Sequence, residues 1–198
     1  MATSKAVVDR HRSSERIRRA AVGLFKARGY HGTSVRELAE VLGMEAASLY
    51  YHFPSKQAIL VDLFDRTMDA LRDGLDRAIA EGATPAAQLR NAVRFHVLFH
   101  IACQDEAFIS HSELRSLTAP NRRRVIAKRD RYEKSICDLL AAGVRAGEFE
   151  IDDIRLTSIA ILMMCSGVSD WFAGRGRLKP EKVADRYTDM VIRLVSVG

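Results

Sequence analysis

The chain of 198 residues has few cysteines, few prolines and no long uncharged run. Its three cysteines, Cys103, Cys137 and Cys165, are widely spaced and form no C-x-x-C pair, which argues against a disulfide framework or a cysteine metal site and for a reducing compartment. Four prolines and 12 glycines exclude a collagen-like or linker-like chain. The longest uncharged stretch, Leu156–Ser169, has 14 residues, fewer than the roughly 18 to 20 that span a bilayer.

Near its start the sequence also lacks an apolar segment with a small-residue cleavage site, so we expect a cytoplasmic protein without a membrane partner. Apolar residues make up 47% and charged residues 28% of the chain, a balance typical of globular proteins. Positive charge is concentrated in residues 1–60, which hold ten Lys or Arg and five Asp or Glu. A basic end joined to a near-neutral remainder indicates that one end meets a polyanion.

Apolar residues recur with helical period along nearly the whole chain, and no segment alternates convincingly with period two. The sequence therefore predicts an all-α fold of about nine helices. We expect a helix-turn-helix domain over residues 1–54, of which 1–8 form a flexible tail. A second helical domain is expected over residues 55–198.

Two short helices separated by a glycine corner indicate the helix-turn-helix. Ser34 and Glu37 form a capping box at the start of the first helix, and Gly43 ends it. The second helix covers about Ala46–His52 and would enter a major groove with its first residues nearest the bases. On spacing alone, a small helical domain with solvated basic faces is an equally good interpretation.

The run Thr33–Ala39, followed by Leu42-Gly43 and Ser48–Gln57, resembles the TetR family of bacterial transcriptional regulators. The resemblance covers about residues 14–64. It implies a DNA-binding regulator rather than an enzyme, with no cofactor and no metal. It also implies that the C-terminal domain binds a small effector and forms a homodimer through the last two helices.

The resemblance further implies roles for single residues of the helix-turn-helix. Thr33 and Ser34 would donate to phosphate, and Arg36 would reach a guanine edge or a phosphate. Ala46, Ala47 and Ser48 at the start of the second helix would read bases. The ring of Tyr50 would pack inside with its hydroxyl near phosphate, and Tyr51, His52 and Lys56 would anchor the DNA backbone. The implied DNA-binding residues are Thr33, Ser34, Arg36, Ala46, Ala47, Ser48, Tyr50, Tyr51, His52 and Lys56.

Ala47 departs from the family pattern, which often has Gly or Pro at this position. Two alanines at reading positions leave little hydrogen-bond readout, so contact with thymine methyl groups is favoured. Glu45, where the family often has Ser or Thr, would cap the second helix weakly. The operator sequence does not follow from these residues.

The last two expected helices are apolar enough to serve a subunit interface. Residues 159–168 are apolar on nearly all sides, and residues 183–195 carry an apolar stripe. A four-helix bundle with a second copy is implied by the resemblance, and a monomer whose core takes up both helices is the alternative. The expected dimer residues are Ile159, Leu162, Val183, Tyr187, Met190, Val191 and Leu194.

Methionine and aromatic side chains on the helices of the second domain predict an adaptable pocket for a bulky apolar effector, with plain core packing as the alternative for each residue. The segment around Trp171, Phe172 and Tyr187 is similar to the ending of family members that sense acyl-coenzyme A or steroid-derived thioesters, so an acyl-coenzyme A is one candidate. The expected ligand-binding residues are Met68, Leu71, Phe95, His96, Phe99, His100, Leu114, Tyr132, Ile136, Met163, Met164, Gly167 and Trp171.

A metal-dependent helical enzyme is the alternative from another class. His96 and His100 lie four apart on one helix face, the spacing of two zinc ligands. Val97 stands where a H-E-x-x-H motif has its glutamate, so a structural or pocket role is favoured. We expect a homodimeric repressor that leaves a palindromic operator when its effector binds, with an activator as the alternative sign of control.

Overall fold

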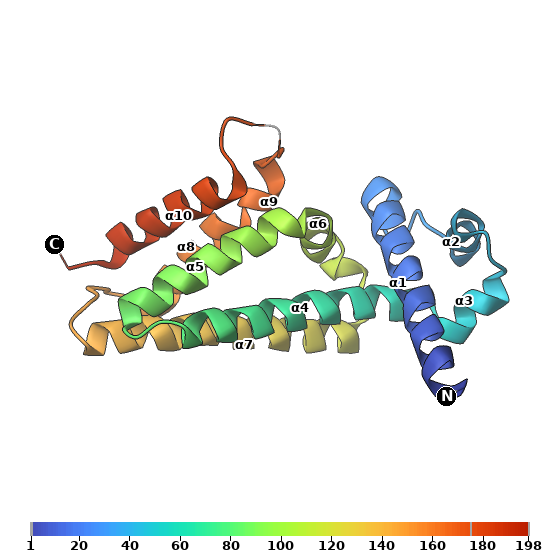
Figure 1. Ribbon diagram of the computed structural model, residues 1–198, viewed down its shortest axis with the longest axis horizontal. Helices are drawn as coiled ribbons and strands as arrows, with labels where there is room; N and C mark the ends of the chain where they lie inside the picture. The colour runs from blue at the N-terminus through green and yellow to red at the C-terminus, as the bar shows by residue number, and fades with distance from the viewer. Residues whose placement is uncertain (1, 175, 198) are drawn as a thin grey trace. The chain divides into compact units, whose positions relative to one another are not determined.

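The computed structural model describes the backbone of residues 2–174 and 176–197, and the side chains of that range from Arg10 onward. This part of the chain is all-α, as predicted, and its one β-type pairing is an isolated bridge between Phe149 and Ser196 (Figure 1). No helix in it is both long enough and apolar enough to cross a bilayer. Within the described ranges the elements are α1 (Ala2–Arg28), α2 (Val35–Leu42), α3 (Ala46–His52), α4 (Lys56–Ala80), α5 (Pro85–Ala102), α6 (Gln104–Ser112), the 3-10 turn η1 (Leu114–Ser116), α7 (Ala119–Arg145), α8 (Ile154–Ser166), α9 (Val168–Trp171) and α10 (Pro180–Val195).

The chain divides into two compact units. Unit 1 comprises Met1–Thr67 and Asp105–Arg124, and unit 2 comprises Met68–Gln104 and Val125–Gly198. The long helices α4 and α7 therefore each contribute residues to both units. The expected boundary at residue 54 lies between α3 and α4, whereas the compact unit around these short helices also includes η1 and α6 from Asp105 onward.

In unit 1, local hydrogen bonds set the ends of the short helices. Ser34 Oγ accepts from the backbone N–H of Glu37, and the Glu37 carboxylate accepts from the N–H of Ser34, so the predicted capping box is present. Gly43 ends α2 with φ 63°, a left-handed conformation that glycine adopts without strain. At the start of α3, Glu45 makes no side-chain capping bond.

Helix α1 begins at Ala2, and no glycine or proline interrupts its sequence before Gly23. The expected flexible tail over residues 1–8 stays a prediction. Further along, Ile17, Ala21 and Phe25 form its buried stripe. Since α1 packs against both α2 and α3, it supplies the platform on which the two short helices cross.

Unit 2 is built around α5, which packs against α8, α9 and α10. One apolar cluster joins α5 to the parts of α4 and α7 that belong to unit 2. Leu75, Leu89, Leu140 and Val191 are almost fully buried in it. Figure 1 shows α5 and α10 running beside one another along this core. Burial of large aliphatic residues on several helices at once fixes their mutual positions.

Candidate DNA-binding surface and buried polar cluster

In unit 1 an open hollow lies where the α1–α2 turn faces α3 and the start of α4. We call it the α2–α3 hollow. Cationic, hydroxyl and aromatic side chains surround it, a mixture suited to phosphate oxygens and base edges. It is lined by His31, Gly32, Thr33, Ser34, Val35, Arg36, Glu37, Tyr50 and Lys56.

Several of the expected DNA-binding side chains project from this surface into solvent. The Arg36 side chain is 88% exposed and forms an i,i+4 ion pair with Glu40, at 3.1 Å from Nε to Oε1. Ala47 and Ser48 at the start of α3 are also exposed, whereas Ala46 is half-buried. A surface ion pair of this kind contributes little to stability, so the guanidinium is free to exchange its partner.

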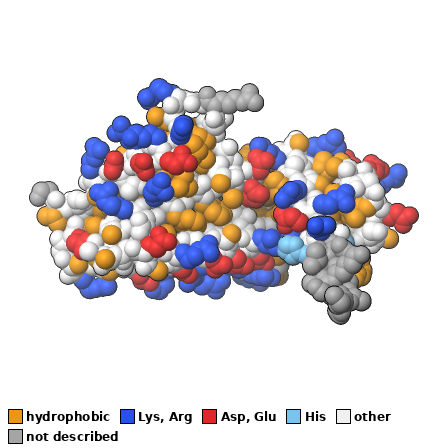
Figure 2. Space-filling model, viewed as in Figure 1, with side chains coloured by type: hydrophobic (Ala, Val, Ile, Leu, Met, Phe, Trp, Pro, Cys, Tyr) orange, Lys and Arg blue, Asp and Glu red, His pale blue; other side chains and the backbone are white. Residues whose placement is uncertain are grey.

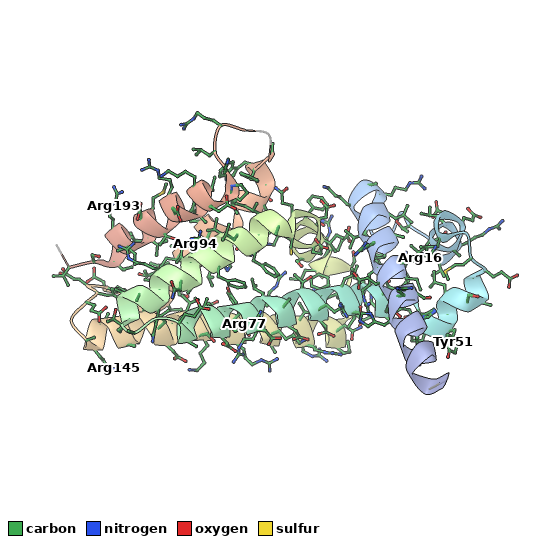
Figure 3. The ribbon with its side chains drawn as sticks, in the orientation of Figure 1. Arg16, Tyr51, Arg77, Arg94, Arg145 and Arg193 are labelled. Atoms are coloured by element: carbon green, nitrogen blue, oxygen red, sulfur yellow. The ribbon has the colours of Figure 1, made fainter. Side chains whose placement is uncertain are left out.

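The two tyrosines of α3 are exposed, although we expected the ring of Tyr50 to pack inside. Tyr50 is half-exposed at the edge of the α2–α3 hollow, and Tyr51 is 69% exposed. Figure 3 shows Tyr51 on α3. The buried position of this short helix is taken instead by Leu49, which has no exposed surface.

Thr33 differs from its expected role of phosphate donor. Its side chain is buried, and its hydroxyl donates to the carbonyl oxygens of Gly29 at 3.0 Å and Leu24 at 3.4 Å. The one hydroxyl proton is thereby used to close the end of α1. Thr33 is therefore a structural residue of the turn, and Ser34, whose Oγ caps α2, is the exposed hydroxyl beside it.

Lys56 is both a wall of the α2–α3 hollow and an internal clamp. Its Nζ donates to the carbonyl oxygens of Tyr30 at 2.7 Å and Thr33 at 2.5 Å, and it lies 4.2 Å from the centre of the Tyr30 ring. Burial lowers the pKa of this ammonium group from its ordinary value, although Glu37 and Glu113 raise it. Since an ammonium has three protons, one donor remains for a ligand in the hollow.

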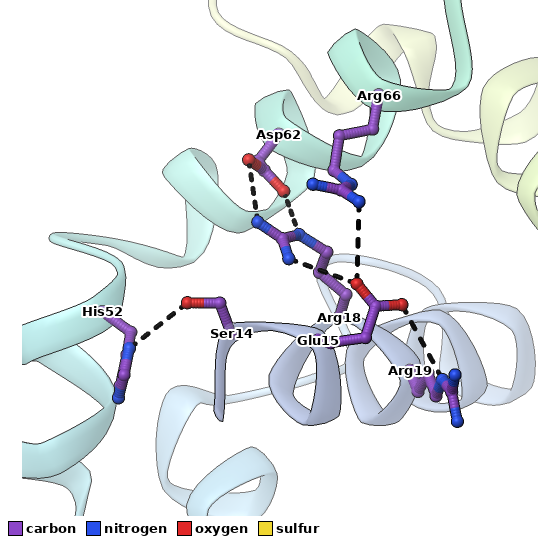
Figure 4. Close-up of polar contacts among 7 residues, drawn as sticks. All are labelled: Ser14, Glu15, Arg18, Arg19, His52, Asp62 and Arg66. Atoms are coloured by element: carbon purple, nitrogen blue, oxygen red, sulfur yellow. Dashed lines mark hydrogen bonds and ion pairs between the residues drawn. The ribbon is translucent and has the colours of Figure 1, made fainter. Parts of the chain in front are cut away.

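At the corner where α1 meets α3, His52 is half-buried and its Nδ1 lies 3.3 Å from Ser14 Oγ. Burial, and secondly the charge of Arg10, lower the pKa of His52 from its ordinary value. Both effects favour the neutral imidazole, which carries one N–H donor. Figure 4 shows the Ser14 contact and, next to it, an ion-pair network on the same stretch of α1.

That network fastens α1 to the first turns of α4. Arg18 donates from Nε and Nη2 to both carboxylate oxygens of Asp62, at 2.5 Å and 3.4 Å, and also contacts Glu15 (Figure 4). Glu15 is shared further with Arg19 and Arg66. A two-point arginine–carboxylate contact with a mostly buried guanidinium defines an orientation, so α1 and α4 hold the helix-turn-helix in a set position.

Two residues to which we assigned no role, Gln57 and Glu113, clasp the turn at Tyr30. The buried Glu113 carboxylate accepts from the Tyr30 N–H at 3.1 Å and from Ser116 Oγ at 2.6 Å. Gln57 donates to the Tyr30 hydroxyl at 3.1 Å and accepts from the N–H of Thr118 at 2.7 Å. Gln57 belongs to the sequence run that carries the family resemblance, whereas no local pattern singles out Glu113.

Unit 2 encloses a polar cluster in its apolar core. His96 Nδ1 lies 2.8 Å from the Tyr132 hydroxyl, and its Nε2 lies 2.9 Å from Ser166 Oγ. Ser166 Oγ is also 3.4 Å from His100 Nε2, so the contacts form a chain across α7, α5 and α8. Burial, with the nearby His100 as a second cause, holds the pKa of His96 well below its ordinary value, so this imidazole is neutral.

The geometry of this cluster does not favour the metal-site alternative. Both ring nitrogens of His96 are engaged with hydroxyl oxygens, and the Ser166 hydroxyl links the two imidazoles. Within the described part of the chain, no group of three or more His, Cys, Asp or Glu side chains is placed to hold a metal ion. The i,i+4 histidine pair is thus part of a hydrogen-bonded core network.

The expected ligand-binding residues fall into several environments. Met68, Leu71, His96, His100, Tyr132 and Ile136 are buried in unit 2, and Phe95, Phe99 and Met164 pack half-buried against the same core. Gly167 is half-buried at the start of α9. Met163 is 72% exposed and Trp171 is more than half exposed, so neither faces that core, and Leu114 belongs to η1 of unit 1.

Some of the expected dimer residues are buried and others are exposed. Val183 and Val191 are buried in the core of their own subunit, because α10 turns this side toward α5, and they are not available to a partner. Met190 is half-exposed and Leu194 is 58% exposed, whereas Ile159, Leu162 and Tyr187 are half-buried.

Leu156 and Met163 of α8 are also exposed, although we expected neither in the interface. Leu156 and Met163 are seven residues apart on α8, and Met190 and Leu194 are four apart on α10, so each pair shares one side of its helix. We call these four exposed side chains together the apolar face of unit 2. Apolar side chains at the surface of the molecule are visible among the charged ones in Figure 2.

Family models and curated relatives both match this chain to bacterial transcriptional regulators. A family model described as bacterial regulatory proteins of the tetR family matches residues 17–63, and one described as the tetracyclin repressor-like C-terminal domain matches residues 82–195. The transcriptional repressor KstR2 of Rhodococcus jostii is 26% identical over 174 residues, covering 87% of this chain and 85% of that protein.

Solved structures of regulators show the same fold. The TetR family regulator PfmR from Thermus thermophilus is 34% identical, with a TM-score of 0.82 and coverage of 90% of this chain and 97% of that one. AibR, solved in complex with isovaleryl coenzyme A and operator DNA, is 26% identical with a TM-score of 0.81, and covers 89% of this chain and 96% of that one.

Proposed function

Because the chain belongs to the TetR family, and is thus a transcriptional regulator and not an enzyme, we propose that two copies bind a palindromic operator and that a small apolar effector releases them. The observation that carries this proposal is the set of exposed groups on α2 and α3, with Arg36, Ser48, Tyr50 and Tyr51 all open to solvent. Repression is the sign of control that the named relatives support. Cytoplasmic location is part of the same proposal.

For DNA contact, we propose that the start of α3 lies in the major groove. Ala46 and Ala47 offer methyl groups for thymine, Ser48 offers a hydroxyl, and Arg36 reaches a guanine edge or a phosphate. Ser34, Tyr50, Tyr51, His52 and the remaining donor of Lys56 contact the DNA backbone, and Thr33 is left out of the set because its hydroxyl is used internally.

For assembly, we propose that the apolar face of unit 2 pairs with the same face of a second copy. Each of α8 and α10 exposes two large apolar side chains on one of its sides, and burying them in a dimer would remove apolar area from water. A twofold dimer would present two α3 helices to successive major grooves about 34 Å apart. An inverted repeat in the operator follows from that symmetry.

For the effector, we propose a molecule with an apolar chain and a hydrogen-bonding carbonyl, such as an acyl-coenzyme A. Unit 2 offers Met68, Phe95 and Phe99 for the chain, and a carbonyl oxygen would replace one acceptor in the hydrogen bonds that join His96, Ser166 and His100. AibR, whose solved structure contains isovaleryl coenzyme A, is a neighbour in fold. Effector binding would favour a state of the dimer in which the two α3 helices no longer match the operator spacing.

The dimer is tested by sedimentation velocity. The wild type is expected to run as twice the mass of one chain, and Leu194→Glu, which puts a charge on the apolar face of unit 2, is expected to run as a monomer. Ile126→Glu on α7, also at an exposed apolar position, is the matched control and should leave the mass unchanged. A wild type that runs as a monomer at micromolar concentration would contradict the proposal.

The effector is tested on the protein bound to its selected duplex. Adding acyl-coenzyme A of increasing chain length should release the DNA and raise the melting temperature of the free protein, whereas coenzyme A alone should do neither. The variant Ser166→Ala should weaken both responses to the acyl compound. Equal responses to coenzyme A and to its acyl form would show that the apolar chain is not recognised.

A further inference from the structure

We propose that Arg10, Tyr51 and His52 form a phosphodiester-binding subsite at the corner of α1 and α3, so that α1 extends the DNA contact beyond the helix-turn-helix. The proposal rests on the operator binding proposed above and deepens it. It adds a residue of α1, in a stretch to which the sequence assigns no role, to the groups that meet DNA.

The first observation is the position of Arg10. Its guanidinium carbon lies over the Tyr51 ring, 5.1 Å from the ring centre, and both side chains are exposed. A guanidinium that covers an aromatic ring uses its face for the contact and keeps the N–H donors at its edge. The ring thus holds the arginine in place while leaving it able to make two parallel bonds to a phosphate.

The second observation is that Arg10 has no ion pair with another residue whose side chain the structure describes. Three other arginines of unit 1 are paired, Arg18 with Asp62, Arg28 with Glu37 and Arg36 with Glu40. An exposed cation fixed by stacking and not by a carboxylate is open to an external anion. Among the side chains that the structure describes, no ion pair of Arg10 would have to break for a phosphate to bind.

The third observation is the neighbouring imidazole. Tyr51 and His52 meet edge to face, with ring centres 5.4 Å apart, and Ser14 Oγ occupies Nδ1 of His52. Nε2 is thereby the ring nitrogen left to a ligand. A guanidinium, a phenol hydroxyl and an imidazole are all phosphate-binding groups, and together they suit an anion with several acceptor oxygens.

The position on the molecule favours DNA as the source of that phosphate. Tyr51 and His52 are the last residues of α3, whose start carries the groups proposed to read bases. A phosphodiester that follows the groove edge would meet the end of α3 and the side of α1 together. The competing interpretation is that Arg10 packs on Tyr51 for stability alone. It predicts that Arg10→Ala leaves the salt slope of DNA binding unchanged.

The test measures the dissociation constant of a random-sequence duplex against salt concentration for the wild type and four variants. Arg10→Ala is expected to weaken binding about fivefold near physiological salt and to reduce the salt slope by about 0.9 per bound chain, the value for one lost phosphate contact. Arg10→Lys keeps the charge and should keep the slope. Tyr51→Ala, which removes the platform, should act as Arg10→Ala does, and Arg123→Ala, an exposed arginine of unit 1, is the matched control.

A second readout follows the His52 resonances by NMR. Binding of the duplex is expected to raise the pKa of His52 in the wild type and to raise it less in Arg10→Ala, because the phosphate is then held less closely. If wild type binds the duplex and Arg10→Ala matches Arg123→Ala in both affinity and slope, the subsite is refuted and operator binding stands. If the wild type binds no duplex, operator binding fails as well.

Discussion

The two units of the molecule distribute polar and apolar side chains in opposite ways. Unit 1 exposes Arg36 and Tyr51, and the Arg18–Asp62 ion pair fastens the helices behind them. Unit 2 encloses His96 and Tyr132 and exposes apolar side chains such as Leu194. A surface rich in hydrogen-bond donors suits a polyanion, whereas exposed apolar side chains suit a second subunit.

The difference has an energetic consequence. An exposed side chain that contacts only a ligand contributes little to the free energy of unfolding, so its replacement changes binding without changing stability. A buried hydrogen-bonded cluster affects stability directly, because removing one side chain leaves its neighbours without a hydrogen-bond partner. Substitutions in the two units should therefore separate into two classes.

The largest expected effect is on stability, from His96→Ala. Loss of the imidazole leaves the Tyr132 hydroxyl and Ser166 Oγ without this partner and opens a cavity, so the free energy of unfolding should fall by about 2–4 kcal/mol. Urea unfolding followed by circular dichroism measures it. His11→Ala, at an exposed position of α1, should stay within about 0.5 kcal/mol of the wild type. A loss below about 1 kcal/mol for His96→Ala would place the cluster outside the stable core.

The next effect is on DNA preference, from Arg36→Ala. If Arg36 contacts a base, the variant should bind the selected operator about 1–3 kcal/mol more weakly and lose preference at one position. Its stability should be unchanged because the Glu40 ion pair is exposed. Fluorescence anisotropy with operator and random duplexes measures both affinities. Equal losses on the two duplexes would show a phosphate contact.

The third effect is the pH dependence of unfolding. In the folded protein the pKa of His96 is well below 6.5, whereas the unfolded chain has the ordinary value. Below about pH 6.5 the unfolded state therefore binds a proton that the folded state does not, and stability should fall by about 1.4 kcal/mol per pH unit between about pH 6 and 5.

The control for this pH dependence is His96→Asn, which has no titrating group at the position and should show a smaller slope over the same range. Denaturant midpoints at a series of pH values provide the comparison. A wild type and a variant with the same slope would show that another group is responsible.

The smallest effect is expected from Lys56→Ala, a substitution in unit 1 that should change both stability and DNA binding. Because Nζ both ties the Tyr30–Thr33 turn and lines the α2–α3 hollow, the variant should lose about 1 kcal/mol of stability and about one unit of salt slope. Lys26→Ala, which breaks only an exposed ion pair with Asp105, should do neither. Loss of stability with an unchanged slope would remove Lys56 from the DNA interface.

Much of unit 1 follows from local sequence. The capping box at Ser34 and the glycine stop at Gly43 depend on neighbours three or four residues away, so α2 and α3 have the predicted bounds. The roles of Thr33 and Lys56 depend on carbonyl groups of a turn, which for Lys56 lies more than 20 residues away. Helical period and motif spacing contain no information on such contacts.

Unit 2 shows the same limit for packing. The period of α10 predicts one apolar stripe, but Val183 and Val191 face the subunit's own core whereas Met190 and Leu194 face solvent. Only the position of α5 separates these two flanks of the stripe. Likewise, the His96–His100 spacing is the same for zinc ligands and for a hydrogen-bonded pair, and the contacts that favour the pair come from Ser166, about 70 residues away.

Selection of bound fragments from a pool of random duplexes, with the purified full chain at low salt, tests the central claim most directly. The account predicts an enriched inverted repeat whose half-sites are centred about one helical turn apart, bound by two copies of the chain. Recovery of no enriched sequence, together with no measurable affinity for duplex DNA, would contradict it.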